Sequence, residues 1–444
     1  MPADGPAALN ALTIDEPALA AMRPSAFTPG RDTPAADAAV HAALTQDFPR
    51  IRALLADAYY LDRLGSAIFY RMPWLLGLGK DLSSLNVVEL GCGRGLKAIP
   101  WSRLVRSYLG VDLDPDVIGF ARNAAKETRR DNLEFHAGNA ADAVRDPARF
   151  GITGRIDVIV LYAVLEHLTP PERKGVLGLC REVLQDGGMT VFCETPNRLI
   201  PHDGHSTYLH FFQTLPPEIA LEYVKRSPRP DAVKAVTDEE SLYRWGQGAS
   251  FHEFDLWMAD AAGRLPGILA DGWSHWPICD EPLRRDELAL NEYLDANGPL
   301  APPAFARFWL DAVFDGAAPP GSMPPVPWVP APEELHNASL FRDRRYHVPD
   351  TLVVNPGGQA AFGLRGGSPV LLLDLAQSEG EVALEDGTGS TLAVLDVAAL
   401  RTARLPRWHG GCAVDLSTFA PLGRLVLRPE GAGSRAVSPG VLVR

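Results

Sequence analysis

The stretch VVELGCGRG, Val87–Gly95, decides the fold that we expect for this chain. It is a short apolar run whose only charge before the glycines is Glu89, and its glycines, Gly91, Gly93 and Gly95, are spaced GxGxG. A strand that ends in a glycine turn before a helix lets backbone N–H groups approach a ligand. A glycine cluster can also be only a tight turn, so the motif by itself leaves both interpretations open.

The next segment, YLGVDLDPD, favours the ligand-binding interpretation. Its apolar run Tyr108 to Val111 ends at Asp112 and is followed by a helical pattern. An acidic residue about 20 positions past the glycines, at the tip of the neighbouring parallel strand, is suited to accept hydrogen bonds from both hydroxyls of a ribose. The sequence therefore predicts Asp112 as a ribose ligand.

Together, these motifs resemble motif I of the class I S-adenosylmethionine-dependent methyltransferases, because the spacing is GxGxG after an acidic residue rather than the dinucleotide GxGxxG. The resemblance runs from about Asn86 to Leu215. LEFHAGNAAD is similar to the third strand and its adenine-contacting turn, IDVIVLYAVLEHL to the fourth strand, and LQDGGMTVFCETPN to the fifth.

This resemblance implies S-adenosylmethionine as the cofactor and assigns its contacts. The methionine end would lie at the glycine turn, the ribose at Asp112, the adenine at Leu113, Asn139 and Ala140, and the sulfonium beside the fourth strand. Asn139 replaces a more usual acidic residue, and its amide oxygen can still accept a hydrogen bond. The cofactor-binding residues implied are Glu89, Gly91, Cys92, Gly93, Gly95, Asp112, Leu113, Asn139, Ala140, Leu161 and Tyr162.

The fourth strand tip bears on metal binding. A similar segment of ubiquinone-pathway O-methyltransferases reads Glu, two apolar residues, Glu, His, and this set can hold a divalent metal. Here Ala163 replaces the first carboxylate, which leaves Glu166 and His167. Two ligands on adjacent residues make a poor metal site, so we expect no metal. His167 either faces the substrate or caps the following helix.

The loop after the fifth strand, ETPNRLIPHDGHSTYLHFFQTLP, supplies the candidates for the general base. An imidazole has a suitable pKa for the proton that is often lost during methyl transfer, although a packed or surface ring is the alternative for each histidine. A similar TPNR segment with histidines and aromatics occurs in bacterial methyltransferases of generic description. The catalytic candidates are His205, His210, His252 and His167.

The patterns predict an α/β fold with a doubly wound, Rossmann-like methyltransferase sheet, a helical cap insertion and a small C-terminal all-β domain. We expect a loose arm over residues 1–45, the methyltransferase domain with preceding helices over 46–215, and a helical acceptor region over 216–316. A Pro-rich linker over 317–345 and a β-sandwich-like domain over 346–444 complete the division.

Composition limits the binding partners and the cellular location that we expect for this chain. The net charge of −13 argues against a nucleic-acid surface, the five scattered cysteines exclude a disulfide framework, and no apolar run reaches the roughly 18 residues of a membrane span. The N-terminus lacks the basic region of a signal peptide. We expect a cytoplasmic enzyme that acts on a small-molecule or saccharide acceptor, with homo-oligomer formation through the C-terminal β domain as an open possibility.

Two other functions compete with methyl transfer. An NAD-dependent oxidoreductase would need the GxGxxG spacing that this chain lacks. A non-catalytic binding or scaffold protein with a methyltransferase-like fold would keep the glycine turn and assign the function to the terminal β domain.

Overall fold

The computed structural model describes residues 46–47, 50–51, 67, 80–271, 285–297, 306–323, 332–341, 351–364, 369–375, 377–402, 407–408, 411–419, 421–438 and 440–443. The arm expected over 1–45 and most of the helical stretch expected over 46–77 lie outside these residues. Among the described residues, no helix combines the length and apolarity required to cross a membrane.

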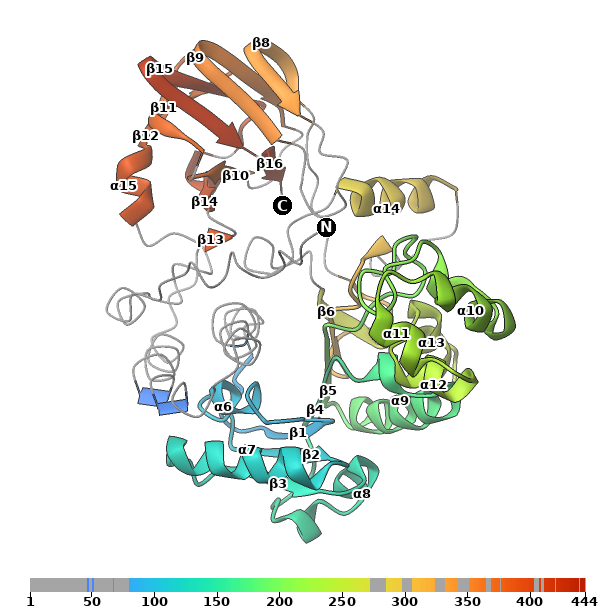
Figure 1. Ribbon diagram of the computed structural model, residues 1–444. Helices are drawn as coiled ribbons and strands as arrows, with labels where there is room; N and C mark the ends of the chain where they lie inside the picture. The colour runs from blue at the N-terminus through green and yellow to red at the C-terminus, as the bar shows by residue number, and fades with distance from the viewer. Residues whose placement is uncertain are drawn as a thin grey trace.

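Five parallel strands form the centre of the first domain, in the order β3-β2-β1-β4-β5 (Figure 1). Every residue of β1, β4 and β5 is buried, as expected for parallel strands that are covered on both faces. The strands are β1 Asn86–Leu90, β2 Ser107–Asp112, β3 Leu133–Ala137, β4 Val158–Tyr162 and β5 Met189–Cys193.

Helices cover both faces of this sheet. Along β1, Val87 packs in one hydrophobic cluster with α6 (Ala98–Trp101) and α7 (Pro115–Thr128). Its neighbour Val88 packs in a second cluster with α8 (Ala140–Arg145) and α9 (Pro170–Gln185). Because successive strand residues point to opposite faces, one short apolar run contributes to two cores. The doubly wound fold is confirmed.

Two further strands extend the sheet from within the region expected to be helical. β6 (Gly267–Asp271) and β7 (Ala312–Asp315) give the order β3-β2-β1-β4-β5-β7-β6, with β7 antiparallel to both neighbours. The helical prediction for the region 216–316 was therefore wrong for residues 312–315. All four residues of β7 are buried, and an amphipathic helix would need a polar face.

The rest of the insertion is helical, and its helices α10 to α13 lie near α9 (Figure 1). Three of its helices share a small core of their own, built from Ala220, Ala232 and Leu242. The helices are α10 Pro217–Tyr223, α11 Pro230–Ala235, α12 Glu239–Arg244, α13 Phe251–Trp257 and α14 Arg285–Asn297. Single 3₁₀ turns are η4 Pro147–Phe150, η5 Leu165–His167, η6 Phe212–Thr214, η7 Val224–Arg226 and η9 Ser417–Phe419.

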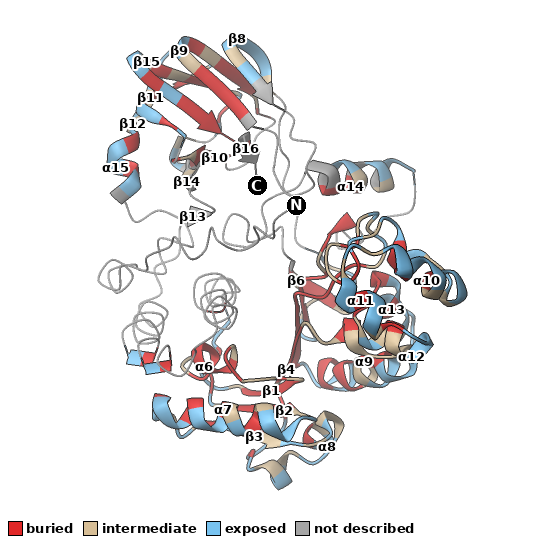
Figure 2. Cartoon of the chain, viewed as in Figure 1, coloured by how far each residue is buried: buried red, intermediate tan, exposed pale blue. Residues whose placement is uncertain are grey.

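The C-terminal domain consists of two antiparallel sheets, in the orders β13-β14-β10-β16 and β12-β11-β15-β9-β8. Figure 2 shows buried residues along the central strands of the larger sheet, and both sheets contribute to one hydrophobic cluster, so the all-β prediction is confirmed. The elements are β8 Pro332–Phe341, β9 Thr351–Gly363, β10 Pro369–Asp374, β11 Glu379–Asp386, β12 Thr391–Asp396, α15 Val397–Thr402, β13 Arg407–Trp408, β14 Gly411–Asp415, β15 Arg424–Ser438 and β16 Gly440–Val443.

The boundary expected for this domain needs correction. We expected the linker to extend over 317–345, but β8 begins at Pro332 and pairs with β9. Proline is tolerated at the first residue of an edge strand, so the Pro-rich composition concealed the start of the domain.

Candidate functional site

In the glycine turn after β1, side chains pack against Gly91 and Gly95, whereas the space beside Gly93 is empty. Gly91, Gly93 and Gly95 all have positive φ, at 72°, 53° and 70°. A Cβ on Gly91 would lie 2.8 Å from Val164 Cγ2, and one on Gly95 would collide with the Phe135 ring, whereas a Cβ on Gly93 would meet nothing within 4 Å. The turn therefore leaves open space beside Gly93, where a ligand can approach the backbone.

Asp112 faces this turn from the end of β2. Its Oδ2 accepts a hydrogen bond from Gly93 N at 2.8 Å, and its Oδ1 accepts one from Asp114 N at 3.0 Å. A carboxylate offers about four lone-pair positions, so both oxygens retain capacity for ribose hydroxyls. The structure thus brings the predicted ribose ligand and the glycine turn together.

The residues expected around the adenine differ in their exposure and in the hydrogen bonds that they already make. Leu113 is 79% exposed, which leaves its side chain available for an apolar contact with a planar base. Asn139 caps α8, because its Oδ1 accepts a hydrogen bond from Ala141 N at 2.9 Å. Ala140 is the first residue of that helix. Asn139 therefore already has a structural role beside any contact with adenine.

The two residues expected beside the sulfonium are buried. Leu161 is fully buried and packs in the core on the α9 face. Tyr162 accepts a hydrogen bond at its hydroxyl from Trp101 Nε1 at 3.0 Å.

Two charged residues at this edge of the sheet, Lys97 and Glu194, were not predicted from the sequence as site residues. Lys97 Nζ lies 2.8 Å from Glu194 Oε2 and 4.1 Å from the centroid of the Tyr162 ring. Glu194 directly follows β5 and has a left-handed backbone, with φ of 58°, and Asp311 Oδ1 accepts a hydrogen bond from its N–H. Strained non-glycine residues cluster at functional sites, but the sequence offered only the position of Glu194 at a strand tip as a signal.

Glu89 is a buried acidic residue of β1 near the charges of Lys97, Asp112 and Glu194. Its side chain is buried, and Tyr108 Oη donates a hydrogen bond to its Oε2 at 3.0 Å. Burial raises the pKa of Glu89 to about 8, although the nearby Lys97 charge opposes that shift. Burial also raises the pKa of the Cys92 thiol, which makes Cys92 a poor nucleophile.

The pKa of Glu89 predicts how cofactor affinity depends on pH. S-adenosylmethionine carries a sulfonium and an ammonium, so it should bind better to ionised Glu89, and its affinity should gain about 1 kcal/mol, roughly fivefold, as pH rises through about 8. Calorimetric titrations at several pH values measure this gain. Glu89→Gln corrects for titration of the ligand's own amino group, and equal pH profiles for wild type and Glu89→Gln would refute the prediction.

The four candidate histidines separate into different environments. His167 and His205 lie together, with ring centroids 5.8 Å apart. His210 instead pairs with His202, at 5.2 Å between centroids and through an isolated antiparallel bridge. His252 is exposed in the first turn of α13. The structure therefore joins two of the four candidates, and these two come from the β4 tip and from the loop after β5.

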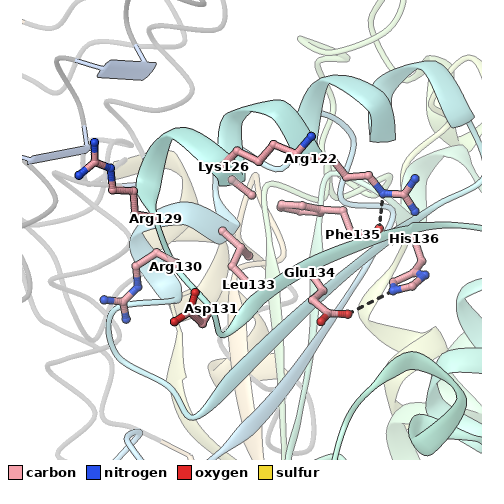
Figure 3. Close-up of a pocket in the computed structure, with 10 residues that line it drawn as sticks. Arg122, Lys126, Arg129, Arg130, Asp131, Leu133, Glu134, Phe135 and His136 are labelled. Atoms are coloured by element: carbon pink, nitrogen blue, oxygen red, sulfur yellow. Dashed lines mark hydrogen bonds and ion pairs between the residues drawn. The ribbon is translucent and has the colours of Figure 1, made fainter.

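A separate basic pocket of about 470 Å³ lies between α7 and the edge strand β3 (Figure 3). Arg122 Nε donates to Phe135 O at 2.8 Å, and His136 Nε2 lies 3.4 Å from Glu134 Oε2. The lining contains none of the residues predicted to bind the cofactor or the acceptor. Its cations gather near the C-terminus of α7, where the helix dipole favours positive charge.

The strand order, the glycine turn after β1 and the carboxylate at the tip of β2 define a Rossmann-like, nucleoside-binding domain. Residues 87–188 match a family model described as a methyltransferase domain. The domain belongs to the class I S-adenosylmethionine-dependent methyltransferases, and this family indicates S-adenosylmethionine as the cofactor. The open space at Gly93 and the orientation of Asp112 fit that group.

Curated relatives match the same part of the chain. The ubiquinone biosynthesis O-methyltransferase of Cereibacter sphaeroides is 33% identical over 125 residues, which are 27% of this chain and 47% of that protein. The mitochondrial ubiquinone biosynthesis O-methyltransferase of Candida albicans is 34% identical over 119 residues, 26% of this chain and 34% of that protein. The chain thus spans about half the length of these relatives, or less.

A solved structure shows a more distant likeness. Magnesium protoporphyrin IX methyltransferase from Synechocystis PCC 6803, determined with bound SAH, has 19% sequence identity and a TM-score of 0.26. The match covers 37% of this chain and 74% of that protein.

Proposed function

We propose that this protein transfers a methyl group from S-adenosylmethionine to an oxygen, or less favourably a nitrogen, of a small molecule, with a sugar, glycan or secondary metabolite as the acceptor. The observation that carries the proposal is the Asp112 carboxylate turned toward an open glycine turn. The two similar proteins from Cereibacter sphaeroides and Candida albicans are O-methyltransferases, which favours oxygen.

The chemistry is an in-line displacement. The bond between sulfur and the methyl carbon breaks as the acceptor oxygen forms its bond to that carbon, and the electron pair of the broken bond stays on sulfur. When bound, S-adenosylmethionine supplies the electrophilic methyl group. The protein must align the acceptor, exclude water and accept the hydroxyl proton.

His167 and His205 are the residues that suit the proton transfer. Burial lowers the pKa of His167, which keeps its imidazole neutral near pH 7. Its Nδ1 donates a hydrogen bond to Arg244 O at 2.9 Å, because a carbonyl oxygen only accepts. Its Nε2 therefore carries the lone pair, as a general base requires.

The acceptor class is proposed from the surface of the loop after β5. Tyr208 and Phe211 are 49% and 57% exposed, and His202 and His210 lie near each other on the same loop. A hydroxylated ring presents apolar faces and a polar rim, so it can stack on aromatic side chains while its hydroxyls bond to imidazoles.

Calorimetric titration of the intact chain with S-adenosylmethionine, S-adenosylhomocysteine and NAD tests cofactor choice. We expect saturable binding of the first two and none of NAD, because the turn has GxGxG spacing. NAD binding without binding of either adenosyl ligand would overturn the assignment in favour of an oxidoreductase.

Methyl transfer itself separates an enzyme from a binding protein. With methyl-labelled cofactor and fractionated small-molecule extracts, we expect label to enter an acceptor fraction and to require the protein. Cofactor binding with no transfer to any fraction would favour the non-catalytic alternative, in which the C-terminal β domain carries the function.

A further inference from the structure

Three metal-ligating side chains meet at the carboxyl edge of the sheet. They are Glu166 and His167 of η5, directly after β4, and His205 of the loop after β5. One ligand atom from each lies within 4.8 Å of the other two. His167 Nε2 and Glu166 Oε1 are 3.7 Å apart. Ligand atoms around one tetrahedral ion lie about 3.3 Å apart, so the side chains would have to rotate toward one another to coordinate it.

The cluster adjoins the cofactor turn. Val164, two residues before Glu166, occupies the space that a Cβ on Gly91 would need. Glu166 is fully buried, while His167 and His205 are partly exposed. A ligand at this cluster would therefore have a buried carboxylate behind it and an approach from the acceptor loop.

The orientation of His167 suits metal coordination. The hydrogen bond from its Nδ1 to Arg244 O directs the lone pair of Nε2 toward the Glu166 side. Histidine ligands in metal sites commonly donate their other ring N–H to a carbonyl or carboxylate in this way, which fixes the tautomer and the ring plane.

His205 is held beside His167 by a rigid loop. Asp203 is buried, and its two oxygens accept six hydrogen bonds from the loop, including one from His205 N at 3.1 Å. The helical insertion adds a further bond, from Arg229 Nη1 to His205 O at 2.7 Å.

The backbone of the insertion at Gly246 also passes close to the rings of His167 and His205. Gly246 has φ of 105°, and a Cβ on it would lie 2.8 Å from His205 Cε1 and 3.4 Å from His167 Cε1. Only glycine allows the backbone to pass so near the two imidazoles. The positions of the rings are thus determined by the loop, by η5 and by the insertion together.

We propose that Glu166, His167 and His205 form a binding site for one divalent cation, with His205 supplying the third ligand that the segment after β4 lacks at Ala163. Two imidazoles and one carboxylate suit Zn²⁺, Co²⁺ or Fe²⁺ rather than Mg²⁺ or Ca²⁺, which prefer oxygen ligands. Three protein ligands leave a coordination position for an exogenous ligand. When bound, the ion would supply a Lewis acid beside the acceptor loop and would occupy the Nε2 lone pair of His167, so His167 could act as the general base only in the metal-free protein. This proposal departs from our sequence-based expectation of no metal.

Titration of the metal-free, full-length protein with Co²⁺ tests the site, because Co²⁺ bound in such sites has visible absorption. We expect saturation at one equivalent and competition by Zn²⁺. His205→Ala should weaken Co²⁺ binding at least tenfold and lower the absorption. His210→Ala removes a histidine of the same loop that lies outside the cluster, and its titration should match wild type.

Stability measurements separate loss of a ligand from loss of the fold. Glu166→Gln keeps the shape of the buried side chain, and its melting temperature without metal should stay near the wild-type value, whereas the rise in melting temperature with Zn²⁺ should disappear. Absence of saturable Co²⁺ binding in wild type, or equal binding by His205→Ala and wild type, would refute the site.

The metal site and the proposed function can fail independently. Metal binding is measured without cofactor or acceptor, so methyl transfer by a protein that binds no Co²⁺ would refute the site and leave the function intact. Co²⁺ binding that depends on His205, in a protein that transfers no methyl group, would support the metal site and refute the proposed function.

Discussion

Asp112→Ala is expected to weaken S-adenosylmethionine binding by about 2 to 4 kcal/mol, or roughly 30- to 700-fold. Both oxygens of Asp112 retain lone pairs for ribose hydroxyls, and each hydrogen bond to a charged group contributes about 1.5 to 3 kcal/mol. The alanine variant also loses the hydrogen bond from Gly93 N to Asp112 Oδ2. This hydrogen bond fixes the backbone of the glycine turn at Gly93. Calorimetric titration with S-adenosylmethionine and S-adenosylhomocysteine measures the loss.

Asp116→Ala is the matched control. Asp116 is exposed in the first turn of α7, four residues further along the chain, and its variant also loses one negative charge. We expect its affinity to stay within about twofold of wild type, because long-range charge effects are screened. Equal affinities for wild type and Asp112→Ala would remove Asp112 from the site and weaken the proposed function.

The centre of the first domain could be predicted because its signals are local. The run Val87–Leu90 is apolar at every position except Glu89, and the three glycines follow it immediately. A short, nearly continuous apolar run before a glycine turn is typical of a parallel strand buried on both faces. Asp112 has the same kind of signal, since it ends the next apolar run.

The edge strands could not be predicted in the same way. β7 is a four-residue run, and periodicity does not separate so short a run from part of a buried helix. What makes it a strand is its pairing with β5, as in the register between Met189 and Asp315. Such pairing between distant segments leaves no trace in the local pattern.

The candidate site was predictable in its residue types but not in its grouping. The histidine-rich loop was evident, yet the pairing of His205 with His167 rather than with His210 depends on the buried Asp203 and on the path of the insertion past Gly246. The ion pair between Lys97 and Glu194 likewise joins the start of α6 to the end of β5.

The largest expected loss of stability follows from breaking a buried ion pair that holds the insertion on α9. Arg173 is 1% exposed, its Nε lies 2.6 Å from Glu253 Oε2, and its Nη1 donates to Gly248 O at 3.2 Å. Arg173→Met leaves the Glu253 carboxylate buried without this cation, so we expect the free energy of unfolding to fall by about 3 to 5 kcal/mol. Urea unfolding measures the change.

Arg181→Met provides the control, because Arg181 lies on the same helix and is exposed. We expect it to change stability by no more than about 0.5 kcal/mol. Adding Glu253→Gln to Arg173→Met should restore part of the loss, since it removes the buried charge. A loss for Arg173→Met no greater than that for Arg181→Met would show that the buried pair contributes little.

The pH dependence of this loss identifies its cause. Burial already raises the pKa of Glu253, against the opposing charges of Arg173 and Arg198, and removing Arg173 should raise that pKa further. A carboxyl group whose folded-state pKa lies above its unfolded value contributes stability below the unfolded pKa and loses it as pH rises through the folded one. The loss of stability in Arg173→Met should therefore be smaller near pH 5 than near pH 8. A loss that does not change with pH would instead attribute it to packing and to the bond with Gly248 O.

The same variant should also loosen the two imidazoles, because Gly248 lies close in sequence to Gly246, whose backbone passes beside His205 and His167.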